Sequence, residues 1–186
     1  MNDKGLDKIR SLVEEVAREL ELVIVDVKMT QQGRRRILLV TIHRRGGRIT
    51  LDDCEKSSRL IEERLDALVS SSEEVTILAS GYDLEVESPG IDRTLKSPSE
   101  LTIFQGEKVE VKLKENHESL GQVFTGELGG YSDGRVVVAN PLPLQVSSSK
   151  KAKKNAAMAP PPPPEVELKD GTYISIKLYP DLAKKA

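Results

Sequence analysis

The first part of the chain switches between two spacings of hydrophobic residues. From Asp3 to Leu20 they recur every three or four positions, which predicts an amphipathic helix. Between Val23 and Met29 they alternate with other residues, and 37–42 is a mostly aliphatic run, so we predict two strands. The loop at 31–34 contains a glycine and joins them as a hairpin.

A second helix and a third strand follow. Thr50 and Asp53 form an approximate capping box, because a hydroxyl at the N-cap is followed three residues later by a carboxylate. A narrow hydrophobic stripe continues behind it at Leu51, Cys54, Ser58, Ile61, Leu65 and Leu68. From Tyr82 to Glu87, hydrophobic and acidic residues alternate, which predicts a strand with one acidic face.

The helical spacing ends near Gly106, after a short helix that starts with Ser97 as N-cap and Pro98 at its first position. About five short strands then follow, at 108–114, 122–128, 135–139, 166–168 and 173–178. Their lengths and spacing predict a small SH3-like or Sm-like barrel. We therefore predict an α+β fold, with an αββαβ domain over residues 1–104 and an SH3-like β-barrel domain over 105–186.

One segment interrupts the predicted barrel. Residues 140–165 are rich in proline, serine and lysine, and end in five consecutive prolines, Pro160 to Pro164. Such a composition buries too little hydrophobic surface to offset the entropy of ordering it. We predict a flexible Lys/Pro-rich insertion here.

Composition excludes several classes of protein. The 186 residues carry a net charge of -2, so nucleic acid can be bound only by a local basic patch. Aromatic residues make up 3%, too few for a single-strand binder that stacks bases on several rings. The single cysteine excludes an internal disulfide and a Cys-rich zinc site. With neither a long apolar run nor a signal peptide, the expected location is the cytoplasm.

Charge is strongly segregated around the second strand. Between Gln31 and Arg48 there are six arginines and no acidic residue; the arginines are Arg34, Arg35, Arg36, Arg44, Arg45 and Arg48. Guanidinium groups suit bidentate contacts with phosphate, so these six are candidate RNA-binding residues. The alternative is a solvated edge strand that its charges protect from aggregation.

The remaining candidate chemistry is weak. Asp83, Glu85 and Glu87 lie on one strand face and could hold Mg²⁺ or Ca²⁺, but an exposed sheet face or a protein-docking face is the better interpretation. Cys54 lies on a hydrophobic stripe and is expected to be inert. Neither His43 nor His117 accompanies a recognisable nucleophile or a second histidine at metal-ligand spacing. We expect no catalytic residue, no metal and no cofactor.

The run from Tyr82 to Leu95, YDLEVESPGIDRTL, resembles the signature of the bacterial ribosome maturation factor RimP family. Leu51-Asp52-Asp53-Cys54 upstream and Phe104-x-Gly106 downstream extend the resemblance. Glu87 and Thr94 stand where the family usually has Ser and Pro, and the 140–165 insertion is not typical of it. The matching motif positions form a candidate surface: Glu85, Ser88, Pro89, Gly90, Asp92 and Arg93. For Pro89 and Gly90, a structural role in the turn is the preferred interpretation.

The resemblance implies a non-enzymatic factor required for maturation of the small (30S) ribosomal subunit. Its expected partner is the immature subunit, contacted through ribosomal RNA and a basic small-subunit protein, and the expected state is a monomer. It implies no membrane contact and no small-molecule substrate. Two alternatives remain: an SH3-like or Sm-like protein-interaction module unrelated to the ribosome, and a metal-dependent nuclease that uses Asp83, Glu85 and Glu87.

Overall fold

The computed structural model describes residues 3–71, 78, 81–144 and 160–180. The chain forms two compact units, Met1–Pro89 and Gly90–Ala186. The fold is α+β: the first unit combines helices and strands, and the second is built around an all-β sheet.

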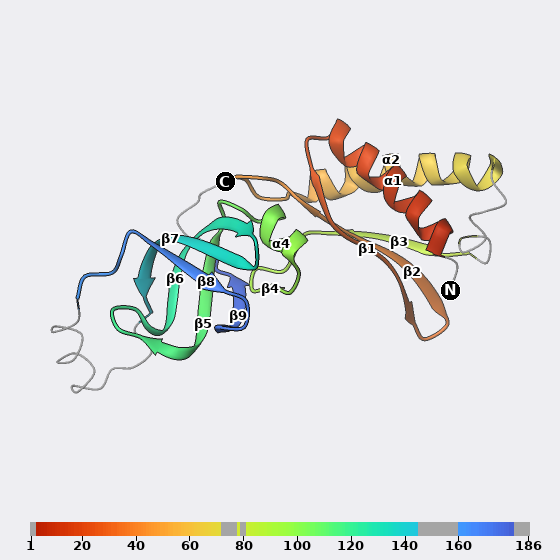
Figure 1. Ribbon diagram of the computed structural model, residues 1–186. Coiled ribbons are helices and arrows are strands. Elements are labelled where there is room, and N and C mark those ends of the chain that lie inside the picture. The colour runs from red at the N-terminus through yellow and green to blue at the C-terminus, as the bar shows by residue number, and fades with distance from the viewer. Residues whose placement is uncertain (1–2, 72–77, 79–80, 145–159, 181–186) are drawn as a thin grey trace. The chain divides into compact units, whose positions relative to one another are not determined.

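The first unit has the order αββαβ (Figure 1). Helix α1 (Asp3–Glu19) precedes strands β1 (Val23–Gln32) and β2 (Arg35–His43), and helix α2 (Leu51–Ser71) precedes β3 (Asp83–Glu87). The sheet order is β1-β2-β3, antiparallel between β1 and β2 and parallel between β2 and β3. Parallel strands need a long crossover, which α2 provides. The predicted helices and strands are confirmed here to within a few residues.

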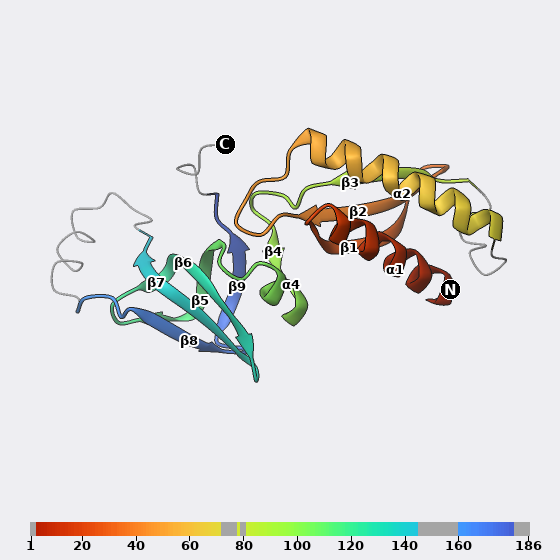
Figure 2. The same cartoon turned by 90° about the horizontal axis from the view of Figure 1, so that it is seen from above.

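Both helices cover the same face of this sheet (Figure 2). The core combines Ile9, Val13 and Val16 of α1, Ile61 and Leu65 of α2, and Leu38, Val40 and Ile42 of the middle strand; all are at most 1% exposed. Because β2 lies between β1 and β3, the interpretation of its arginines as protection for an edge strand is wrong. The sequence did not indicate this because β3, the parallel partner of β2, follows only after helix α2, and the spacing of hydrophobic residues within β2 does not reveal such a distant partner.

The second unit contains a six-stranded sheet with the order β4-β9-β5-β6-β7-β8. Its elements are β4 (Thr94–Leu95), α4 (Pro98–Ile103), β5 (Lys108–His117), β6 (Gly121–Ser132), β7 (Arg135–Pro143), β8 (Glu165–Lys169) and β9 (Tyr173–Leu178). All of its strand pairs are antiparallel. Within the described residues, no pairing joins the outer strands β4 and β8 into a closed barrel.

The boundary between the units lies earlier than the predicted 104/105. Strand β4 pairs with β9, with Thr94 opposite Lys177. After α4, the Gln105 side-chain amide donates to the Gly129 carbonyl at 2.8 Å, and the Gly106 amide donates to Leu128 at 2.7 Å. Phe104 is completely buried. The segment 90–106 therefore belongs to the second unit, through long-range contacts that its local sequence does not reveal.

The two ends of the predicted insertion are ordered parts of the sheet. Strand β7 continues to Pro143, which pairs with Phe124, and the Asn140 amide donates to the Pro164 carbonyl at 2.8 Å. Strand β8 starts at Glu165. The rest of the predicted flexible segment, 145–159, lies outside the described residues. Within the described ranges, no helix is long and apolar enough to span a bilayer.

Candidate functional site

Three candidate arginines lie where β1 turns into β2. The turn depends on Gly33, whose φ of +62° favours glycine. Arg34 and Arg35 are exposed and Arg36 is partly buried. The Arg35 Nε donates to Asp83 Oδ2 of β3 at 2.8 Å, and this hydrogen bond raises the pKa of the guanidinium. Since both partners are about half exposed, the pair adds little stability and leaves Arg35 accessible.

The other three arginines lie between β2 and α2. Arg44 Nη2 donates to Asp53 Oδ1 at 2.7 Å. Asp53 also accepts from the Thr50 amide and hydroxyl, both at 2.9 Å, and its own amide donates to the Thr50 hydroxyl. This confirms the capping box. The Thr50 amide hydrogen bond is the largest influence that lowers the pKa of Asp53, and Arg44 adds to it.

The six arginines therefore form two clusters rather than one patch. Arg35 and Arg44 are nine positions apart along β2 and the residue after it, which is about 30 Å in an extended strand. The assumption that the run lacks counter-ions is wrong for Arg35 and Arg44, because Asp83 and Asp53 come from distant parts of the chain. Arg34 and Arg45 make no ion pair with any residue that the structure describes.

The acidic strand lies beside this hairpin. Asp83, Glu85 and Glu87 are opposite Ile37, Leu39 and Thr41 of β2, and they alternate with Leu84 and Val86, which pack against the core, so they share the sheet face away from the helices. The Thr41 hydroxyl donates to Glu87 Oε1 at 3.2 Å. In the part of the chain that the structure describes, no group of three or more His, Cys, Asp or Glu is placed to hold a metal ion. The three carboxylates form an acidic row along the strand surface, and they do not converge on a common point where an ion could bind.

The motif residues divide between the two units. Glu85, Ser88 and Pro89 belong to the first unit, with Glu85 and Ser88 exposed. Gly90 belongs to the second, where its carbonyl accepts from the Arg93 amide at 3.1 Å and closes a turn that carries the exposed Asp92.

Arg93 has a structural partner that the sequence did not reveal. Its Nε and Nη2 donate to Glu100 Oε1 at 2.9 and 2.6 Å, and the other Glu100 oxygen accepts from the Lys96 and Ser97 amides. Burial acts to raise the pKa of Glu100, but the Lys96 amide and Arg93 outweigh it and lower the pKa. Glu100 also closes a capping box with Ser97 at the start of α4, and a carboxylate buried there needs a cation such as Arg93.

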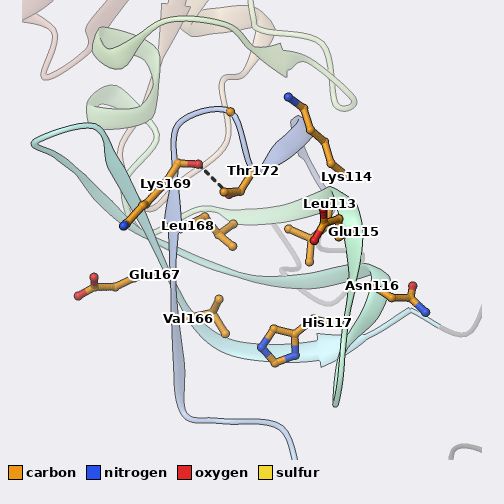
Figure 3. A pocket seen from close by; sticks show the side chains of 11 residues that line it. Leu113, Lys114, Glu115, Asn116, His117, Val166, Glu167, Leu168, Lys169 and Thr172 are labelled. Atoms are coloured by element: carbon orange, nitrogen blue, oxygen red, sulfur yellow. Dashed lines mark hydrogen bonds between the residues drawn. The ribbon is translucent and has the colours of Figure 1, made fainter.

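A cavity of about 520 Å³ opens in the second unit between the end of β5 and β8 (Figure 3). The hydrophobic side chains Leu113, Val166 and Leu168 face it, while Glu167 points away. His117 Nδ1 accepts from the Ser119 amide at 3.3 Å. The side chains that face the cavity therefore form an apolar lining, and they do not include an acid and a base paired as in a catalytic site. In the first unit, Cys54 is partly buried, and burial raises the pKa of its thiol, which is typical of an unreactive cysteine.

The comparison with known families assigns the first unit. Residues 12–92 match the family model described as the RimP N-terminal domain. The match covers the second half of α1 and all of β1, β2, α2 and β3, together with both arginine clusters and the acidic row. It ends at Asp92, just after the motif has passed from the first unit into the second. The family resemblance drawn from the sequence is thus confirmed, and residues 12–92 carry the N-terminal domain of the RimP family.

Proposed function

We propose that the protein is a non-enzymatic assembly factor that binds the immature small ribosomal subunit in the cytoplasm. The observation that carries this proposal is the RimP N-terminal domain over residues 12–92. The hairpin end supports it, because Arg34 and Arg35 are exposed there beside the partly buried Arg36, and exposed guanidinium groups can reach the phosphates of folded RNA.

The hairpin cluster is the better RNA contact of the two. Arg44 is held by Asp53 at the start of α2, where Asp52 adds a second negative charge. A phosphate approaching Arg44, Arg45 and Arg48 would meet those carboxylates. At the hairpin, Asp83 pairs with Arg35, and the exposed Arg34 makes no ion pair with any residue that the structure describes.

The acidic row suits a different partner. Asp83, Glu85 and Glu87 would repel RNA and attract a basic ribosomal protein. The second unit would act as the SH3-like module of the protein and add another contact. Two weak contacts joined by a short linker strengthen each other through their high effective concentration.

The alternative is a protein-interaction module that is unrelated to the ribosome. The cavity beside β8 favours it, since β8 is an outer strand and a peptide could pair with its free edge above an apolar floor. Such a module would copurify with one protein, and nuclease treatment would not release it.

Sucrose-gradient sedimentation of a lysate separates these functions, because an assembly factor travels with small subunits and leaves them after nuclease treatment. The variant that tests the proposed RNA contact is Arg34→Gln/Arg35→Gln/Arg36→Gln, which removes the three positive charges of the hairpin. The control removes three positive charges from the helices of the same unit, with Arg18→Gln/Lys56→Gln/Arg59→Gln. We expect only the hairpin variant to bind subunits more weakly and to show a salt slope that is shallower by about one to three. Equal behaviour of the two variants would contradict the RNA contact.

A further inference from the structure

The outer face of the second unit's sheet carries lysines in a regular arrangement. Along β5, the buried residues Val109, Val111 and Leu113 face the core, and the residues between them face outward. Those outward residues are Lys108, Glu110, Lys112 and Lys114. The strand alternation therefore presents three lysines and one glutamate on the same side of the sheet.

Strand β9 extends this arrangement sideways. Lys177 lies opposite Glu110, and Ser175 lies opposite Lys112. Lys177 is also opposite Thr94 of β4 on its other side. We call Lys108, Lys112, Lys114 and Lys177 the lysine face. Two acidic residues lie near the lysine face: Glu110 on β5, and Glu127 on β6, which is opposite Lys108.

The lysine face is not neutralised by its neighbours. Among the residues that the structure describes, none of its four ammonium groups has a carboxylate oxygen within ion-pair distance. Elsewhere in the same unit, Arg93 pairs with Glu100 and Arg135 with Glu167. Lys108 Nζ lies 5.3 Å from the centre of the Tyr179 ring, a cation–π contact that holds the ammonium without cancelling its charge.

We propose that the lysine face is a second RNA contact, which binds phosphates of the ribosomal RNA backbone. This inference rests on the proposed function, and it assigns to the second unit a surface that the N-terminal family match does not reach. Ammonium groups without carboxylate partners keep counter-ions that an RNA phosphate displaces, which favours binding. An acidic protein fits less well, because a protein interface needs an apolar centre. The outward residues among the lysines on β4, β5 and β9 are the polar Thr94, Glu110 and Ser175, and on the neighbouring β6 the hydrophobic Val123 opposite Lys112 is followed by Thr125 and Glu127.

The test is a titration of immature small subunits with the full chain at several salt concentrations. The variant is Lys112→Gln/Lys177→Gln, which keeps both positions polar. The control is Arg135→Gln/Lys169→Gln, which removes the same charge from β7 and β8. Circular dichroism checks that both variants fold. The single change Lys112→Gln, at an exposed position, serves as a milder variant.

We expect the slope of log affinity against log salt to become shallower by roughly 0.7 to 0.9 for each lysine that contacts RNA. The control slope should stay unchanged. Combining the lysine and hairpin-arginine variants should add their effects, because the residues lie on separate units. An unchanged slope in the folded lysine variant overturns the inference. So does weaker binding with an unchanged slope, which indicates a protein partner.

The same titration against naked small-subunit RNA separates this inference from the proposed function. Suppose that the wild-type chain does not bind subunits, but that the lysine variant still binds naked RNA with a shallower slope of log affinity against log salt than the wild type. The assembly role is then wrong, and the assignment of the lysine face as an RNA contact is supported. If the wild type binds subunits and only the arginine variant changes, the assembly role stands and the lysine face fails.

Discussion

Replacing Glu100 with alanine tests both the energetics of the second unit and the position of its boundary. The Glu100 residue is 8% exposed, and its carboxylate accepts two hydrogen bonds from Arg93 and one each from the Lys96 and Ser97 amides. Removing it leaves a mostly buried guanidinium and two helix-start amides without that acceptor. We expect a loss of about 2–4 kcal/mol in the free energy of unfolding, since breaking a fully buried pair costs about 3–5 kcal/mol and this one is partly open to solvent.

The tyrosines make this measurement specific for one unit. Three of the four, Tyr131, Tyr173 and Tyr179, lie in the second unit, so near-ultraviolet circular dichroism during urea unfolding reports mainly on it. Far-ultraviolet circular dichroism follows the long helices of the first unit. The tyrosine transition should move to lower urea, while the helix transition stays in place. Glu127→Ala, at an exposed position of β6, is the control and should change neither.

The lowered pKa of Glu100 also makes the stability lost in Glu100→Ala depend on pH. Because the folded state lowers the pKa of this carboxylate, its stabilising effect is present above the unfolded pKa and is lost as pH falls through the folded value. The difference between wild type and Glu100→Ala should therefore shrink toward acidic pH. A loss below about 0.5 kcal/mol would refute the reasoning about the ion pair. An equal shift of the helix transition would place α4 with the first unit instead.

Further predictions concern other bonded groups. Burial, together with the hydrogen bond to Asp170, raises the pKa of Tyr173 to about 12, so the stabilising effect of this residue should persist up to about pH 10 and be lost above it. In an ultraviolet absorbance titration, the Tyr173→Phe variant should lack a tyrosine that ionises near pH 12 in the wild type. Asp170 accepts from the hydroxyls of both Tyr131 and Tyr173, and Asp170→Ala should cost about 1–2 kcal/mol in the tyrosine-detected transition. Asp53→Ala removes the α2 capping box and the partner of Arg44, and should cost about 1–2 kcal/mol in the helix-detected transition.

Local features of the sequence predicted the first unit well. The hydrophobic spacing located both helices and all three strands, and the Thr50/Asp53 capping box and the Ser97 N-cap formed at the predicted residues. These features depend on side chains a few positions apart, so a single sequence contains the whole signal.

The missed features depend on contacts between distant residues. The counter-ions of Arg35 and Arg44 come from β3 and α2, and the central place of β2 follows from its pairing with β3 after the crossover. The segment 90–106 looked like the end of the first domain because its partners, β6 and β9, occur later in the chain. Whether six strands close into a barrel also depends on the outer pair, which local alternation does not determine.

The pairing of β4 with β9 has a consequence for synthesis of the chain. The Leu178 amide donates to the Arg93 carbonyl at 2.9 Å, so the first residues of the second unit are held in place by hydrogen bonds to β9. During translation, α1 to β3 can assemble as soon as Glu87 has left the exit tunnel. The second unit then has to wait until Leu178 emerges, with the edge of β5 unprotected in the meantime. The two units of one polypeptide can thus fold at different times, and only the second depends on the synthesis of β9.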